Sequence, residues 1–121
     1  MHRHSTYSVE EIFGLMEARA VGGPLAVTPE GHKLKVSSDR LRLFKEKGLG
    51  CVSCPLVGIF FALEDHNGET PHLNLYGVTE KGREVMMTKD HIRPKAKGGR
   101  NEMANYQPMC ADCNGKKADK Y

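Results

Sequence analysis

The stretch of sequence that decides the fold is Lys89-Asp90-His91-Ile92-Arg93-Pro94-Lys95-Ala96-Lys97-Gly98-Gly99. Two Cys-x-x-Cys pairs enclose this stretch, and Asn114 directly follows the second pair. The pairs are Cys51/Cys54 and Cys110/Cys113. Four thiols in two such pairs indicate a zinc site. The Asp-His pair and the asparagine indicate a second, hydrolytic metal site that the zinc site holds in place.

The composition fits one small domain with a thin core. The chain has 121 residues, of which 39% are hydrophobic, with 13 Gly and no Trp. Small cores of this kind usually need a further cross-link, such as disulfides or a structural metal ion. No apolar run is long enough to span a membrane, and the polar start does not resemble a signal peptide. We therefore expect a cytoplasmic protein, where paired cysteines favour a metal over disulfides.

The positive charge is concentrated in the C-terminal third. Residues 81–121 carry ten Lys or Arg against five Asp or Glu, whereas residues 1–80 carry eight against ten. A basic surface attracts a polyanion, most commonly a nucleic acid. The charge alone also fits a solvated surface, so it supports a nucleic-acid partner only together with the motifs.

The four cysteines are expected to bind a structural zinc ion. Four thiolates complete a tetrahedron and leave no open position for water. Because 55 residues separate Cys54 from Cys110, the ion would close a long loop. The alternatives are two disulfides or four unrelated thiols. Redox chemistry at one pair would leave the other unexplained.

The residues around His91 suit the hydrolysis of a phosphodiester. That reaction needs a base for water and a cation beside the developing negative charge. Histidine suits the base role, and Mg²⁺ or Mn²⁺ prefers carboxylate and amide oxygens such as those of Asp90 and Asn114. Neighbouring residues of a strand point to opposite faces, so a bend before Pro94 must bring Asp90 and His91 toward one phosphate.

At these residues the chain resembles the HNH endonucleases, whose fold is called ββα-metal. The segment 90–94 followed by Gly98 and Gly99 matches the first part of the motif, 105–110 matches its centre, and 113–117 matches its helix. The resemblance covers about residues 49–119 and is greatest to short phage-encoded members. It implies cleavage that leaves a 5′-phosphate and a 3′-hydroxyl.

The resemblance also implies a role for each residue of the site. His91 is expected to be the general base, and Asp90 and Asn114 the ligands of the catalytic ion. Asn105 is expected to tie the loop and orient His91, with Asn101 as the competing candidate. The expected contacts to DNA phosphates are Arg93, Lys95, Lys97, Arg100, Lys116 and Lys117.

The sequence also predicts the helices and strands of the scaffold. Ser8 and Glu11 form a capping box that predicts a helix start. Ser37 or Ser38 can cap a second helix, which Gly48 would end. Strands are predicted at 57–63, 72–76 and 84–87, a hairpin at 25–28 and 33–36, and a last helix at 111–119.

The predicted fold class is α+β: a zinc-stapled ββα-metal core at residues 49–121, preceded by a helical and hairpin extension at residues 1–48. The predicted function is a metal-dependent DNA endonuclease, in a bacterial host cell if the chain is phage-encoded. One alternative is a zinc-containing module that binds DNA without cutting it. Another is a protein-interaction domain stapled by zinc. Two further partners besides DNA are considered: a second copy of the chain, and a phage or host protein.

Overall fold

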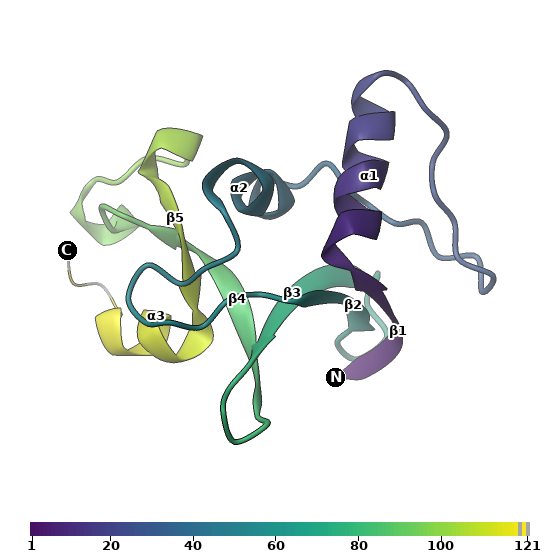
Figure 1. Cartoon of the computed structure of the whole chain (residues 1–121). Coiled ribbons are helices and arrows are strands. Elements are labelled where there is room, and N and C mark those ends of the chain that lie inside the picture. The colour runs from purple at the N-terminus through teal and green to yellow at the C-terminus, as the bar shows by residue number, and fades with distance from the viewer. Residues whose placement is uncertain (119, 121) are drawn as a thin grey trace.

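The computed structural model describes residues 1–118 and 120, and these form one five-stranded antiparallel sheet with helices on its two faces (Figure 1). The elements are β1 (His2–Ser8), α1 (Val9–Ala20), α2 (Asp39–Lys47), β2 (Phe60–Asp65), β3 (His72–Val78), β4 (Glu84–His91), the 3-10 turns η1 (Lys95–Lys97) and η2 (Met103–Asn105), β5 (Tyr106–Cys110) and α3 (Ala111–Lys117). The strands lie in the order β1-β2-β3-β4-β5. The sheet is thus a meander in which each strand pairs with the next strand along the chain.

The third strand joins two parts of this sheet that diverge from each other. Its residues 72–76 pair with β2, whereas only 76–78 pair with β4. Beyond that point β4 pairs with β5, from Met87 opposite Cys110 to His91 opposite Tyr106. In Figure 1 the β4–β5 pair accordingly turns away from the β1–β2 pair. The candidate site residues lie in the part that β4 and β5 build.

The sequence predicted both N-terminal helix starts correctly. Ser8 caps α1 in a complete capping box with Glu11, and the hydroxyl of Ser38 accepts the Leu41 N–H at the start of α2. Gly48 ends α2 with φ of +104°, a conformation that glycine adopts without a steric cost. These local signals therefore set how the chain enters and leaves both helices.

Other expectations need correction. The polar start forms β1, which the sequence analysis did not predict and which pairs with β2. The predicted hairpin at 25–28 and 33–36 is only a chain reversal with one antiparallel bridge, Val27 to Lys33. The strand predicted at 57–63 begins at Phe60. The last helix ends at Lys117, and its predicted end at residue 119 lies outside the described residues.

The hydrophobic core draws on both halves of the chain. Ile12 of α1 and Phe44 of α2 belong to the same buried cluster as Phe61 of β2 and Met87 of β4, each at most 1% exposed. Burial of this kind contributes about 1.5–3 kcal/mol for each large side chain. Residues from both sides of residue 48 share this core. The predicted division of the chain at that residue stays a prediction.

Two helices flank the β4–β5 pair from opposite sides (Figure 1). Helix α2 contacts β4 and β5 from one side, and α3 contacts the same two strands from the other. This arrangement places the last helix against the end of β4 that carries the Asp-His pair. In the described part of the chain, the helices are too short and too polar to cross a membrane.

Candidate functional site

The four cysteines converge on one point. Their Sγ atoms all lie within 4.8 Å of one another, and none forms a disulfide. Cys54 Sγ and Cys110 Sγ are 3.8 Å apart, which matches the separation of about 3.8 Å that Zn–S bonds of 2.3 Å impose in a tetrahedron. The cluster is therefore positioned to bind a metal, and its donor set fits zinc.

Three structural elements bring these sulfurs together. Cys51 and Cys54 lie in the segment after α2, Cys110 ends β5, and Cys113 lies in the first turn of α3. Cys110 also caps α3, because its sulfur accepts the Cys113 N–H. One residue thus ends the strand, begins the helix and supplies a thiol to the cluster.

The thiols influence one another strongly. Burial raises the pKa of Cys51, but N–H groups of Cys110 and Ser53 outweigh it and lower that pKa to about 7. The hydrogen bond with Cys110 and burial raise the pKa of Cys113. Crowded thiols resist forming several thiolates together unless a cation compensates the charge. This electrostatic conflict is the one that a bound Zn²⁺ would resolve.

A second group of polar residues surrounds a pocket of about 280 Å³ between the end of β4, the following loop and α3. The pocket is lined by Lys89, Asp90, His91, Pro94, Lys95, Ala96, Asn114 and Ala118. Three residues that the sequence analysis assigned to the site, Asp90, His91 and Asn114, therefore share one pocket. The bend before Pro94 gives the two neighbours on β4 access to the same space.

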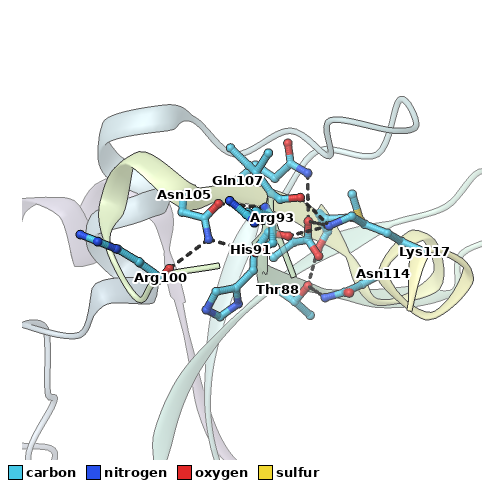
Figure 2. Close-up of polar contacts among 11 residues, drawn as sticks. Thr88, His91, Arg93, Arg100, Asn105, Gln107, Asn114 and Lys117 are labelled. Atoms are coloured by element: carbon cyan, nitrogen blue, oxygen red, sulfur yellow. Dashed lines mark hydrogen bonds and ion pairs between the residues drawn. The ribbon is translucent and has the colours of Figure 1, made fainter. Parts of the chain in front are cut away.

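The carboxylate of Asp90 is buried and held from two sides. Asp90 is 5% exposed, and its Oδ2 accepts hydrogen bonds from Gln107 Nε2 at 2.9 Å and from Lys117 Nζ at 2.8 Å. Lys117 Nζ also donates to the carbonyl oxygen of His91 at 2.6 Å. Figure 2 shows Lys117 reaching from α3 toward the strands. The predicted contact of Lys117 with DNA stays a prediction, and the structure gives its ammonium an internal partner.

Asn114 is oriented by the neighbouring strand. Its Nδ2 donates to Thr88 Oγ1 at 2.8 Å, and that hydroxyl donates to the Met109 carbonyl oxygen at 2.7 Å (Figure 2). With the amide nitrogen engaged in this way, the side-chain oxygen remains to face a cation. An amide oxygen and a carboxylate suit Mg²⁺ or Mn²⁺, so the residues present fit the predicted ion.

The imidazole of His91 contacts two residues. Its Nε2 lies 2.8 Å from Asn101 Oδ1, and its ring meets the buried Tyr106 ring edge to face, with centroids 5.1 Å apart. Since an amide oxygen only accepts hydrogen bonds, Nε2 is the donor. This tautomer leaves the lone pair on Nδ1, which is the nitrogen able to take a proton from water.

Asn105 ties the loop that follows β4. Its Oδ1 accepts the Arg93 N–H at 2.8 Å, and its Nδ2 donates to the carbonyl oxygens of Arg93 and Arg100 at 3.1 and 3.0 Å (Figure 2). The loop is tight, because a Cβ at Gly99 would collide with the Arg93 carbonyl oxygen. Asn105 therefore holds the loop, whereas Asn101 contacts the imidazole. The role of either residue in orienting His91 stays a prediction.

The predicted phosphate contacts differ in exposure. Those exposed to solvent are Arg93, Lys95, Lys97, Arg100 and Lys116, whereas Lys117 is largely covered. Arg93 also donates from Nε to the Lys97 carbonyl oxygen at 2.7 Å, which stiffens the loop. Of these five cations, Lys95 lines the pocket at His91, whereas Arg93 and Arg100 line a separate pocket at the loop.

Sequence reasoning missed several supporting residues. Thr88 orients Asn114, Gln107 holds Asp90, and Tyr106 lies against His91. One signal was available for Lys117, which follows Asn114 by three residues and so lies on the same face of a helix. The others depend on strand pairing, which the sequence does not display.

Comparison with known proteins gives one family. Residues 79–121 match the family model described as HNH endonuclease. This segment holds β4, β5 and α3. The resemblance to the HNH endonucleases that the sequence analysis predicted is therefore confirmed for this segment. No curated protein and no solved structure gives a significant match.

Proposed function

We propose that the chain is a metal-dependent DNA endonuclease in which β4, β5 and α3 form the ββα-metal core. The observation that carries the proposal is the shared pocket of Asp90, His91 and Asn114, placed within the segment that matches the HNH endonucleases. Binding DNA alone would not require a base, a carboxylate and an amide oxygen at one point. The exposed cations of the loop and of α3 would position the DNA backbone.

His91 acts as the general base in this proposal. Asn101 holds Nε2, so Nδ1 is left to accept a proton from the attacking water. Tyr106 limits rotation of the ring through its edge-to-face contact. Removal of the proton makes water nucleophilic at neutral pH, and attack on phosphorus then breaks the bond to the 3′ oxygen.

Asp90 and Asn114 would hold the catalytic Mg²⁺ or Mn²⁺. When bound, the ion supplies positive charge beside the phosphate oxygens as negative charge develops. The contribution of the chain is orientation, since Gln107 and Lys117 fix the carboxylate and Thr88 fixes the amide. The zinc ion at the four cysteines would have a structural role and keep α3 against β5.

The test of the proposal is plasmid cleavage in a titration of Mg²⁺ and Mn²⁺. His91→Ala should lose about 10²-fold or more in rate, the usual scale for removal of a general base. Its melting temperature and DNA affinity should stay near wild type, because the ring lies at the pocket surface. Cleavage at the wild-type rate by His91→Ala would exclude the base role. A wild-type protein that binds DNA and never cuts it would favour the binding module instead.

A second variant distinguishes the role of the catalytic ion from that of the zinc ion. Asn114→Ala removes one oxygen ligand and keeps all four thiols, so zinc content and melting temperature should stay near wild type while cleavage falls. High Mn²⁺ should restore part of the rate by mass action. Asn114→His should retain activity, because histidine is the other residue that the resembled family carries at this position, and it should shift the metal preference toward ions that favour nitrogen ligands. Full activity of Asn114→Ala at limiting Mg²⁺ would remove Asn114 from the ion site.

A further inference from the structure

A second cleft, of about 570 Å³, lies beside the candidate active site. It is lined by Lys35, Ser38, Asp39, Arg40, Thr88 and Lys89. The cleft opens where β3 has already parted from β4, since their pairing ends at Tyr76 and Met86. Its other wall is the first turn of α2 and the segment before it. Four of its six lining residues therefore come from the part of the chain outside the HNH match.

The charge of this cleft is mainly positive. Lys35, Arg40 and Lys89 contribute three cations against one carboxylate, that of Asp39. The Arg40 guanidinium donates to the Leu73 carbonyl oxygen at 2.7 Å, and its Nε is buried without a hydrogen-bond partner among the described residues. Within that same part of the chain, no carboxylate forms an ion pair with Arg40. Arg40 also lines another pocket with Glu64, Asp65 and Glu69, so its charge is shared between that pocket and the cleft. Lys35 and Lys89 are the cations that favour a bound anion in the cleft itself.

The cleft and the active-site pocket share one lining residue. Lys89 lines both of them. Its ammonium lies 4.4 Å from the centroid of the Tyr106 ring, the same ring that His91 contacts. Thr88 lines the cleft and binds Asn114, which lines the pocket. A chain of phosphate groups leaving the pocket along β4 would therefore enter the cleft directly.

We propose that this cleft binds a phosphodiester group of the nucleic-acid backbone next to the one at His91. Lys35, Arg40 and Lys89 neutralise that phosphate, and the segment before α2 thus forms part of the substrate-binding surface. The inference rests on the proposed function, because it takes the pocket at His91 as the site of the cleaved bond. It adds a subsite to which Lys35 and Arg40 contribute from outside the family match.

The test is DNA affinity in a variant that cannot cut. A short fluorescent duplex is titrated with His91→Ala protein in Mg²⁺, and binding is followed by anisotropy over a range of salt concentrations. Adding Lys35→Glu should weaken binding about fivefold to tenfold and reduce the magnitude of the salt slope by about 0.9. Lys35→Arg should bind like the parent. Because Lys35 is exposed, the melting temperature of both variants should match that of the parent.

The matched control is Lys81→Glu, which makes the same charge change in the turn between β3 and β4, at the far end of β4 (Figure 1). Its affinity should stay near that of the parent. Equal weakening by Lys35→Glu and Lys81→Glu would mean a general charge effect and would overturn the subsite. The nuclease function would stand if wild type still cut plasmid. Conversely, selective weakening by Lys35→Glu in a protein that never cuts DNA would support the cleft while the nuclease function fails.

Discussion

The ammonium of Lys117 lies 2.8 Å from Oδ2 of Asp90, and the two side chains are only 15% and 5% exposed. A lysine expected on the DNA-facing surface is therefore the internal counter-charge of the carboxylate proposed to bind the catalytic ion. Lys117 follows Asn114 by one helical turn, so α3 brings both side chains to β4. The helix thus supplies a fixed positive charge and an amide at the same edge of the pocket.

Lys117→Met should lower the melting temperature by roughly 10 degrees or more. The variant leaves the buried Asp90 carboxylate without its cation, and removal of one partner of a buried ion pair costs about 3–5 kcal/mol. Added Mn²⁺ should recover part of this loss, because the ion offers the carboxylate a new counter-charge. Lys116→Met, at the exposed neighbouring position, is the control and should melt like wild type. Identical melting of both variants would show that the ion pair contributes nothing to stability.

Asn101 and Asn105 should give different defects. Asn105→Ala removes three hydrogen bonds to the loop and should lower both stability and cleavage. Each lost bond contributes about 0.5–1.5 kcal/mol. Asn101→Ala removes the contact to His91 Nε2 and should lower the cleavage rate with little change in melting temperature. Calorimetry and plasmid-nicking rates on the two variants separate these roles. Cleavage at the wild-type rate by Asn101→Ala would show that this hydrogen bond is not needed to orient His91.

Loss of the thiol cluster should unfold the C-terminal half. Cys51→Ser removes a sulfur that accepts N–H groups of Ser53 and Cys110. Structural zinc can contribute about 10 kcal/mol or more of folding free energy, so the variant should aggregate or lose its cooperative transition. Ser53→Ala, between the two cysteines of the first pair, should keep full zinc content by elemental analysis. Folded, active wild-type protein without zinc would contradict this role.

Because of Glu64, the free energy of unfolding should decrease at acid pH. Burial alone would raise the pKa of this carboxyl, but hydrogen bonds from Tyr76, Asn74 and Arg3 outweigh it and hold the pKa below its usual 4.5. The Tyr76 hydroxyl donates at 2.5 Å and the Asn74 amide at 2.9 Å, both to Oε1. A lowered folded-state pKa means that the stabilisation is complete above the unfolded pKa and is lost as pH falls through the folded one.

The melting temperature of wild type should therefore fall as the pH drops below about 4.5, the usual carboxyl range. Glu64→Gln should be less stable than wild type at neutral pH, and the difference should shrink in acid as the wild-type carboxylate takes up a proton. Glu80→Gln, at an exposed position in the β3–β4 turn, is the control and should follow wild type throughout. A constant difference between Glu64→Gln and wild type at every pH would attribute the effect to packing.

Local signals in the sequence determined a large part of this structure. The Ser8 capping box and the Ser38 hydroxyl place the starts of two helices, because both act on N–H groups within three residues. The spacing within each cysteine pair predicted the thiol cluster, because Cys-x-x-Cys spacing by itself brings the two sulfurs of a pair close together. The order of Asp90, His91 and Asn114 likewise indicated one pocket before any geometry was available.

Only the tertiary structure decided how those residues are supported. The strand at His2–Ser8 carries no strong pattern of its own and exists because β2 offers it an edge. Lys117 is an exposed cation by composition, and its partner Asp90 is 27 positions earlier in the chain. The cleft lined by Lys35 depends on β4 parting from β3 beyond Met86. Helix caps and Cys-x-x-Cys pairs act over a few residues, so the sequence alone predicts them. Strand pairing, and the burial of charged side chains that follows from it, depends on contacts between distant segments of the chain.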